Sequence, residues 1–191
     1  MPNFIKSAIA PIDWINDQVI EICLVGRSNV GKSSLINALA NQSIAKTSKT
    51  PGRTQTINFY DFGNYRLIDL PGYGFMHGNH QLKEQVADII QTYLTSRTNT
   101  YGVLQICDAN VITEADVNMS HYLQKHFKNH YIILNKIDKG TISMYQNKLN
   151  SIAKYLKVQP TQIFFISIKK HLNINKIQAI INSTIKQIKN N

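Results

Sequence analysis

Short apolar runs alternate with stretches of helical periodicity along most of the chain. The runs are rich in Ile, Val, Leu and Tyr and end at polar or glycine positions, which is typical of buried strands. Those that we expect to form strands are Val19–Val25, Thr56–Phe62, Tyr65–Leu70, Tyr101–Cys107, Tyr131–Asn135 and Ile163–Ser167. Elsewhere apolar residues recur every three or four positions, which predicts helices with one buried face. The stretches with this repeat are Leu82–Leu94, Tyr145–Leu156 and Ile174–Ile188.

This alternation predicts an α/β fold of three layers, with a mostly parallel sheet and helices on both faces. One pair of strands has no helix between them, because only Gly63 and Asn64 separate Thr56–Phe62 from Tyr65–Leu70. A two-residue Gly-Asn link fits a β-hairpin. We therefore expect a six-stranded sheet with one antiparallel edge strand. Ligands of such sheets bind at the carboxyl ends of the strands.

The composition is that of a folded chain. The 191 residues are 43% hydrophobic and 17% charged, which suits a single domain over residues 1–191 and argues against disorder. Cys23 and Cys107 are too few for a disulfide scaffold or a four-cysteine zinc site. No apolar run approaches the ~20 residues of a membrane span, and the N-terminal residues lack a secretory signal. We expect a cytoplasmic protein without stable membrane insertion.

The net charge of +10 is concentrated in the last part of the chain. Residues 139–191 contain nine lysines and no carboxylate. One interpretation is a lysine-rich composition that fills solvated helix faces. The other is a surface that meets a polyanion such as RNA, because neutralised phosphates give salt-sensitive affinity without sequence preference. The sequence leaves both interpretations open.

Residues 26–33 read G-x-x-x-x-G-K-S, directly after an expected strand and before an expected helix at Ser34–Ala40. In this context the glycines let backbone N–H groups surround phosphate, and the helix N-terminus adds its partial positive charge. Lys32 would contact the β- and γ-phosphates, and the Ser33 hydroxyl would coordinate Mg²⁺. The motif predicts a nucleotide-binding phosphate loop.

Two further motifs stand where expected strands end. Asp69–Gly72 reads D-L-P-G, so that the carboxylate can hold a water on Mg²⁺ and the Gly72 N–H can contact a γ-phosphate. Asn135–Asp138 reads N-K-I-D. The Asp138 carboxylate can accept hydrogen bonds from N1–H and the 2-amino group of guanine, whereas adenine would leave that charge facing a lone pair. With the Lys136 stem over the purine, the motifs predict a P-loop GTPase domain.

Two weaker features complete the expected site. Ser167 ends the last expected strand, where a backbone N–H can meet guanine O6. The polar segment Thr47–Thr56 has no apolar anchor, and it predicts a loop that folds over bound nucleotide and donates a threonine hydroxyl to Mg²⁺. Spacing alone does not choose among its threonines.

Together these residues resemble the translation-factor-related small GTPases and, more narrowly, the EngB family of bacterial ribosome-assembly GTPases. The resemblance rests on GRSNVGKSSLINAL, SKTPGRTQTINFY, DLPGYGF and NKID, in that order, and runs from about Phe4 to the C-terminal helix. It implies one G domain with an N-terminal extension (residues 1–18), a first switch (44–56) and a second switch (69–80). It also implies a role in late assembly of the large ribosomal subunit, and in cell division and septation.

The resemblance assigns roles to individual residues. Ser33 and Thr54 would be the direct Mg²⁺ ligands, and Asp69 would act through a water. The implied catalytic residues are Asn29, Lys32, Thr54 and Gly72. The implied GTP contacts are Gly26, Arg27, Ser28, Asn29, Val30, Gly31, Lys32, Ser33, Gly52, Arg53, Thr54, Gln55, Thr56, Asp69, Leu70, Pro71, Gly72, Asn135, Lys136, Ile137, Asp138, Ile166, Ser167 and Ile168.

The sequence departs from the family pattern at three places. Ile166 and Ser167 stand where members usually have two serines, and His171–Ile174 lacks the glycine usual there. Asn135 replaces a threonine common in the family, but asparagine is the general GTPase residue.

Tyr73 follows Gly72 at the position where Ras-like proteins carry the glutamine that orients the attacking water. We therefore predict slow intrinsic hydrolysis, on the order of the ~10⁻⁴ s⁻¹ of an unassisted GTPase. The ribosomal particle or a monovalent cation would accelerate it. In several related GTPases that lack the glutamine, an asparagine at the position of Asn29 helps to hold K⁺, so we hypothesise that K⁺ stimulates hydrolysis through Asn29.

The expected protein is a monomer that cycles between GTP and GDP and binds the large ribosomal subunit. One rival is a P-loop nucleotide kinase, but four arginines are few for an arginine-rich lid, and such an enzyme has no use for the NKID motif. Competition of labelled GTP by ATP separates these two. The second rival is a GTP-dependent scaffold at the membrane or septum without useful turnover, which multiple-turnover assays distinguish.

Overall fold

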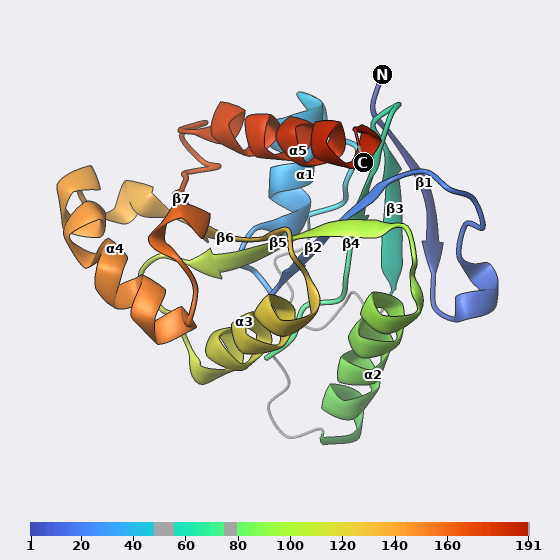
Figure 1. The fold of residues 1–191 in the computed structure, drawn as a ribbon, viewed down its shortest axis with the longest axis horizontal. Coiled ribbons are helices and arrows are strands. Elements are labelled where there is room, and N and C mark those ends of the chain that lie inside the picture. The colour runs from blue at the N-terminus through green and yellow to red at the C-terminus, as the bar shows by residue number, and fades with distance from the viewer. Residues whose placement is uncertain (48–55, 75–79, 191) are drawn as a thin grey trace.

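The computed structural model describes residues 1–47, 56–74 and 80–190. A central sheet lies between two layers of helices (Figure 1). The strands are β1 (Asn3–Ala8), β2 (Glu21–Gly26), β3 (Ile57–Asp61), β4 (Arg66–Asp69), β5 (Thr100–Asp108), β6 (His130–Asn135) and β7 (Ile163–Phe165). The α-helices are α1 (Lys32–Ala40), α2 (His80–Ser96), α3 (Glu114–His126), α4 (Ile142–Leu156) and α5 (Ile174–Lys189). Short 3₁₀ turns occur at Pro11–Asp13, Ile137–Lys139 and Pro160–Gln162.

The α/β fold with helices on both faces is confirmed. The strand order is β1-β3-β4-β2-β5-β6-β7, and the pairs from β4 to β7 are all parallel. The predicted hairpin is present, because β3 and β4 pair antiparallel with Asn58 opposite Asp69 and Asp61 opposite Arg66. All six expected strands therefore exist, and their ends lie within two residues of the expected ones.

The expected count of six strands was wrong, because the described residues already form a sheet of seven. The additional strand β1 pairs antiparallel with β3 and takes the edge position that we had expected for β3. Its residues are mostly exposed, including Phe4 and Ile5, so the segment lacks the apolar alternation by which the other strands were found. Helix α3 was also not expected, since its sequence is largely polar.

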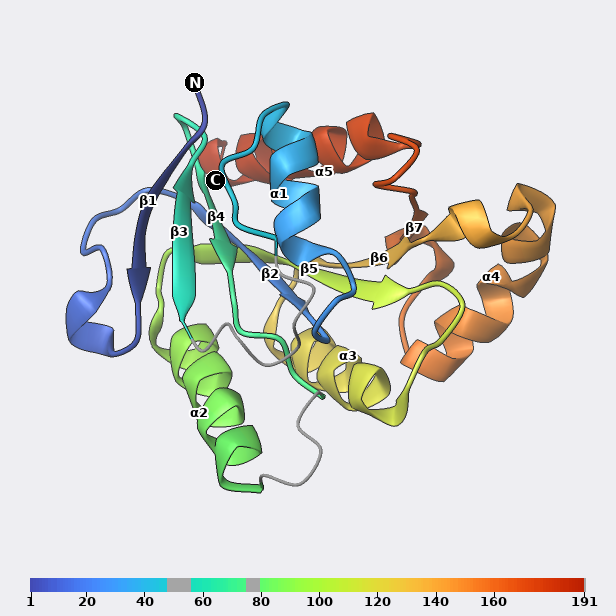
Figure 2. The same cartoon turned by 180° about the vertical axis from the view of Figure 1, so that it is seen from behind.

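Two apolar layers fix the helices to the sheet. Helices α1 and α5 cover one face, where Leu35 and Ile36 meet Ile177 and Ile181 (Figures 1 and 2). Helices α2 and α3 cover the other face, where Tyr93 is fully buried. Helix α4 packs beside β6 and β7. Because apolar side chains pack against both faces of the sheet, the ends of its strands are held in fixed positions. A site at this edge would therefore be built on a rigid support.

A buried ion pair joins the start of β2 to the end of α2. The side chain of Glu21 is fully buried, and its carboxylate accepts hydrogen bonds from Arg97 Nε at 3.1 Å and from the Tyr93 hydroxyl at 2.7 Å. The Arg97 guanidinium also lies 5.9 Å from the ring centroid of Trp14. A buried carboxylate depends on such partners, because its desolvation is not otherwise compensated.

We predict that Arg97→Met lowers the free energy of unfolding by about 3–5 kcal/mol, since it leaves the Glu21 carboxylate buried without its cation. Urea denaturation followed by circular dichroism measures this loss. The matched control is Arg66→Met, which breaks an ion pair to Asp17, whose side chain is 37% exposed. Because water can replace the lost partner there, we expect a cost of about 1 kcal/mol. Equal losses in the two variants would contradict the role given to burial.

Candidate nucleotide-binding site

The predicted motifs meet at one edge of the sheet. The phosphate loop leaves β2 and enters α1, Asp69 ends β4, Asn135 ends β6, and Ser167 follows β7. Since these strands are parallel neighbours, their carboxyl ends lie side by side. The fold thus brings together segments separated by more than a hundred residues, at the edge where such sheets bind ligands.

The phosphate loop depends on a left-handed backbone and on close contacts. Asn29 has φ 63° and Gly31 has φ 114°. A Cβ atom on Gly31 would lie 2.6 Å from Asn135 Nδ2, and this same nitrogen donates to the Val30 carbonyl at 2.8 Å. Only glycine therefore fits at position 31, and the phosphate loop is bonded directly to the NKID motif.

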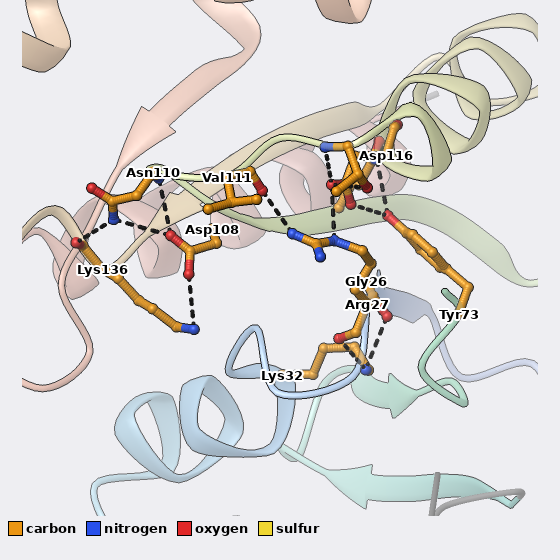
Figure 3. Close-up of polar contacts among 11 residues, drawn as sticks. Gly26, Arg27, Lys32, Tyr73, Asp108, Asn110, Val111, Asp116 and Lys136 are labelled. Carbon is orange, nitrogen blue, oxygen red and sulfur yellow. Dashed lines mark hydrogen bonds and ion pairs between the residues drawn. The ribbon is translucent and has the colours of Figure 1, made fainter. Parts of the chain in front are cut away.

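Lys32 is buried at the centre of the loop. Its ammonium group donates to the carbonyl oxygens of Gly26 at 3.1 Å and Arg27 at 3.5 Å (Figure 3). Burial lowers the pKa of Lys32, and the nearby Asp69 carboxylate offsets part of this effect. A cation enclosed by backbone groups at a helix N-terminus is a suitable partner for a phosphate.

Ser33 and Asp69 fit the requirements of a Mg²⁺ site. The Ser33 hydroxyl donates to Asp69 Oδ2 at 2.8 Å, which leaves the serine lone pairs available to a cation. Asp69 Oδ1 is buried and has no hydrogen-bond partner among the described residues. Burial raises the pKa of Asp69, while Lys32 and Ser33 act in the opposite direction. The orphaned oxygen would be satisfied by a water on a bound Mg²⁺, as hard cations prefer.

The expected guanine contact is organised by a second serine. The Ser167 hydroxyl donates to Asp138 Oδ1 at 2.6 Å, and this bond lowers the pKa of the exposed Asp138 carboxyl. The carboxylate is therefore ionised and oriented. The backbone N–H of Ser167, however, donates to the Leu172 carbonyl at 3.2 Å. A turn after β7 thus uses the N–H of Ser167, and the expectation that a backbone N–H at this strand end meets guanine O6 stays a prediction.

The neighbouring residues link the base motif to the strand ends. The Ile168 N–H donates to Asn135 Oδ1 at 3.2 Å, and the Ile137 N–H donates to the carbonyl of Ile166 at 3.3 Å. Asn135 thus connects the phosphate loop on one side with the segment after β7 on the other.

Asp108 and Asn110 support Lys136 and were not among the expected site residues. Asp108 pairs with Lys136 Nζ at 2.9 Å, and its other oxygen accepts from the backbone N–H of Asn110 at 2.9 Å (Figure 3). Burial would raise the pKa of Asp108, but these hydrogen bonds hold it below the usual value. Asp108 ends β5 in register with Asn135 at the end of β6, so it could be found only once these two strands were known to be neighbours.

The remaining expected contacts divide into three groups. Leu70 and Pro71 are buried, and Gly72 packs on the phosphate loop, since a Cβ there would lie 2.8 Å from Ser28 N. The Thr56 hydroxyl lies 3.3 Å from Asn58 Oδ1. Residues 48–55 of the first switch fall outside the described ranges, so the expected contacts of four residues there, including the Mg²⁺ ligand, stay predictions. These are Gly52, Arg53, Thr54 and Gln55.

The Arg27 side chain turns away from the phosphate loop. Its guanidinium donates to Asp116 on α3 at 3.0 Å and to the carbonyl of Val111 at 2.6 Å. The Tyr73 hydroxyl donates to the same Asp116 at 3.0 Å, so the phenol points away from the Lys32 ammonium group (Figure 3). Both side chains are thus bonded to Asp116, outside the phosphate loop.

This fold and this site define a P-loop GTPase. The family model of a 50S ribosome-binding GTPase matches residues 21–136. The chain is 50% identical to a probable GTP-binding protein EngB of Malacoplasma penetrans, over 97% of this chain and 100% of that protein. It is 46% identical to the corresponding protein of Mycoplasmoides gallisepticum, over 93% and 95%. The chain belongs to the EngB family of GTP-binding proteins.

Solved structures agree with this assignment. A crystal structure of a probable EngB protein superposes with a TM-score of 0.74 at 26% identity, covering 87% of this chain and 99% of that one. Era in complex with MgGDPNP and part of 16S ribosomal RNA gives a TM-score of 0.62 at 25% identity, covering 88% and 56%. Within the described ranges, none of the helices is long and apolar enough to cross a bilayer.

We predict that Asp138→Asn weakens GDP binding at least tenfold, because the new amide N–H₂ group faces the 2-amino group of guanine. Xanthosine diphosphate, which carries a carbonyl there, should bind the variant better than it binds the wild type. Calorimetry with both nucleotides measures these affinities. The matched control is Asp88→Asn on the exposed surface of α2, which should change neither. Unchanged GDP affinity in Asp138→Asn would remove guanine recognition from this carboxylate.

Proposed function

We propose that this protein is a slow GTPase switch that uses Mg²⁺ and acts in late assembly of the large ribosomal subunit. The single observation that carries the proposal is the pairing of two carboxylates with two serines at one edge of the sheet. Asp69 with Ser33 lies beside the phosphate loop, and Asp138 with Ser167 lies where the base would bind. One pair suits a metal-bound triphosphate and the other suits guanine.

The chemistry asked of the protein is mainly positioning and charge stabilisation. Lys32 and the N–H groups of the phosphate loop would stabilise the charge that develops on the β- and γ-phosphates. The Gly72 N–H would hold the γ-phosphate, and Ser33, Thr54 and a water on Asp69 would hold Mg²⁺. When bound, Mg²⁺ would neutralise phosphate oxygens. Residues 44–56 and 69–80 would be the two switches, and residues 1–18 a family-specific extension.

Slow turnover is supported by the orientation of Tyr73. Its hydroxyl is bonded to Asp116, so the residue after Gly72 does not offer a water-orienting group. We propose that an additional charge or partner accelerates hydrolysis. K⁺ near Asn29 and the ribosomal particle are the two candidates. The alternative, a GTP-dependent scaffold at the membrane or septum, shares the same site but would show no useful turnover.

We predict that replacing Na⁺ by K⁺ at constant ionic strength raises multiple-turnover GTP hydrolysis at least fivefold, because K⁺ supplies positive charge next to the transferred phosphoryl group. Asn29→Ala should lose this stimulation. Phosphate release is the measurement, with choline as an inert control cation. Equal rates in K⁺ and Na⁺, or a K⁺ response that survives in Asn29→Ala, would remove the hypothesis.

The ribosomal role is supported by the 50S ribosome-binding family model and by the charge of the last 53 residues, 139–191. This segment contains nine lysines and no Asp or Glu. The lysines of α5, which are Lys176, Lys186 and Lys189, are exposed. Such a surface suits ribosomal RNA. From the family resemblance we further propose that the protein is monomeric and cytoplasmic, and that it is needed for cell division and septation.

We predict that the protein co-sediments with large ribosomal subunits in a non-hydrolysable GTP analogue and less so in GDP. Binding should fall steeply with salt, and each lost phosphate contact should reduce the log–log slope by about 0.7–0.9. Lys186→Gln/Lys189→Gln should reduce both affinity and slope. The control is Lys125→Gln, an exposed lysine on α3, the helix that covers the other face of the sheet. Absence of sedimentation in both nucleotide states would contradict the ribosomal role and leave the GTPase assignment intact.

A further inference from the structure

Asp116 is a fully buried carboxylate that lies outside all nucleotide-binding motifs. It accepts hydrogen bonds from Arg27 Nε at 3.0 Å, from the Tyr73 hydroxyl at 3.0 Å, and from the backbone N–H and hydroxyl of Thr113, both at 2.9 Å. These donors come from the phosphate loop, the residue after Gly72 and the start of α3. Figure 3 shows the side chains of Arg27 and Tyr73 converging on Asp116.

Helix capping explains only part of this arrangement. Thr113 is the N-cap of α3, and Asp116 completes a capping box with it. A capping box satisfies the first N–H groups of a helix and needs no further donor. The bonds from Arg27 and Tyr73 connect the helix to two segments of the nucleotide site, which a cap alone does not require.

The contact with Tyr73 also fixes the segment before it. The Tyr73 carbonyl accepts from the Ser28 N–H at 3.3 Å, so this residue is anchored through its backbone and through its side chain. Gly72 is consequently pressed on the phosphate loop, where a Cβ would lie 2.7 Å from Ser28 Oγ and 2.9 Å from Ser28 Cα. The Gly72 amide is thus held next to the third residue of the loop.

The Tyr73 hydroxyl acts both as a hydrogen-bond donor and as an acceptor. It donates to Asp116 and accepts from Gln105 Nε2 at 3.2 Å, and this same nitrogen donates to the Asp116 carbonyl at 2.8 Å. The Gln105 carbonyl oxygen faces His130 Nε2 at 3.1 Å. Burial raises the pKa of Tyr73, so the phenol stays protonated and can donate. A buried network whose members are all bonded holds one geometry.

We propose that Asp116 is a positioning residue for recognition of the γ-phosphate. Through Tyr73 it holds the Gly72 amide against the phosphate loop, so that the preference for GTP over GDP depends on the contact between Asp116 and Tyr73. This inference rests on the proposed function of the site as a GTP switch. GDP lacks the γ-phosphate, and its affinity therefore does not depend on where the Gly72 amide lies.

The test measures two affinities for each variant, one for a fluorescent non-hydrolysable GTP analogue and one for fluorescent GDP. Tyr73→Phe removes only the hydroxyl, and Asp116→Asn keeps the volume while it removes the charge. Each variant should bind the GTP analogue at least fivefold more weakly than the wild type does. Its affinity for GDP should change less than twofold. Thr113→Ala is the matched control, because it removes a capping hydroxyl from Asp116 but leaves the bonds to Arg27 and Tyr73. It should lower stability and leave the ratio of the two affinities unchanged.

The double variant Tyr73→Phe/Asp116→Asn shows whether the two residues act through one contact. If they do, the ratio of GTP-analogue affinity to GDP affinity in the double variant should equal the ratio in the single variant that binds the GTP analogue more weakly. If the two residues act independently, the free-energy changes of the two single variants should add. Additive effects, equal losses for both nucleotides, or an unchanged ratio in Tyr73→Phe would overturn the proposal. Tyr73→Phe decides the matter if Asp116→Asn does not fold. A wild-type protein that binds neither nucleotide would instead overturn the proposed function.

Discussion

The side-chain amide of Asn135 is the contact on which the nucleotide site depends. Its nitrogen donates to the Val30 carbonyl in the phosphate loop, and its oxygen accepts from the Ile168 N–H after β7. A single buried side chain thereby holds three segments in fixed relative positions. An amide suits this task because it is donor and acceptor at once and carries no charge to desolvate. The phosphate loop and the segment after β7 therefore share one support.

The two carboxylate–serine pairs extend this arrangement. In each pair the hydroxyl proton is directed at the carboxylate, which leaves the remaining oxygen atoms for a ligand. Asp69 lies in a buried position where an orphaned oxygen needs a further partner, whereas Asp138 is exposed and ready to receive N–H groups. In the proposed function, the same pair of residue types would hold a hydrated cation at one end of the site and a purine edge at the other.

The sequence allowed the fold class, the hairpin and the residues of three motifs to be predicted, because apolar periodicity and motif spacing are local signals. Strand β1 escaped prediction because its side chains are mostly exposed, and it is a strand only because β3 offers backbone partners. Asp116 escaped because its importance comes from Arg27 and Tyr73, 89 and 43 residues away. Asp108 could have been found from strand register, but only once β5 and β6 were known to be neighbours.

The antiparallel contact of β1 with β3 has a consequence for self-association. Without β1, the backbone N–H and C=O groups along one side of β3 would be open to a strand of another molecule, next to the aromatic residues Phe59 and Tyr60. Strand β1 pairs with these groups and becomes the edge itself, a short strand that carries Lys6 and whose register with β3 shifts between Phe4 and Lys6. The edge that the sheet presents to other molecules is therefore short, irregular and charged, which are features that disfavour intermolecular strand pairing.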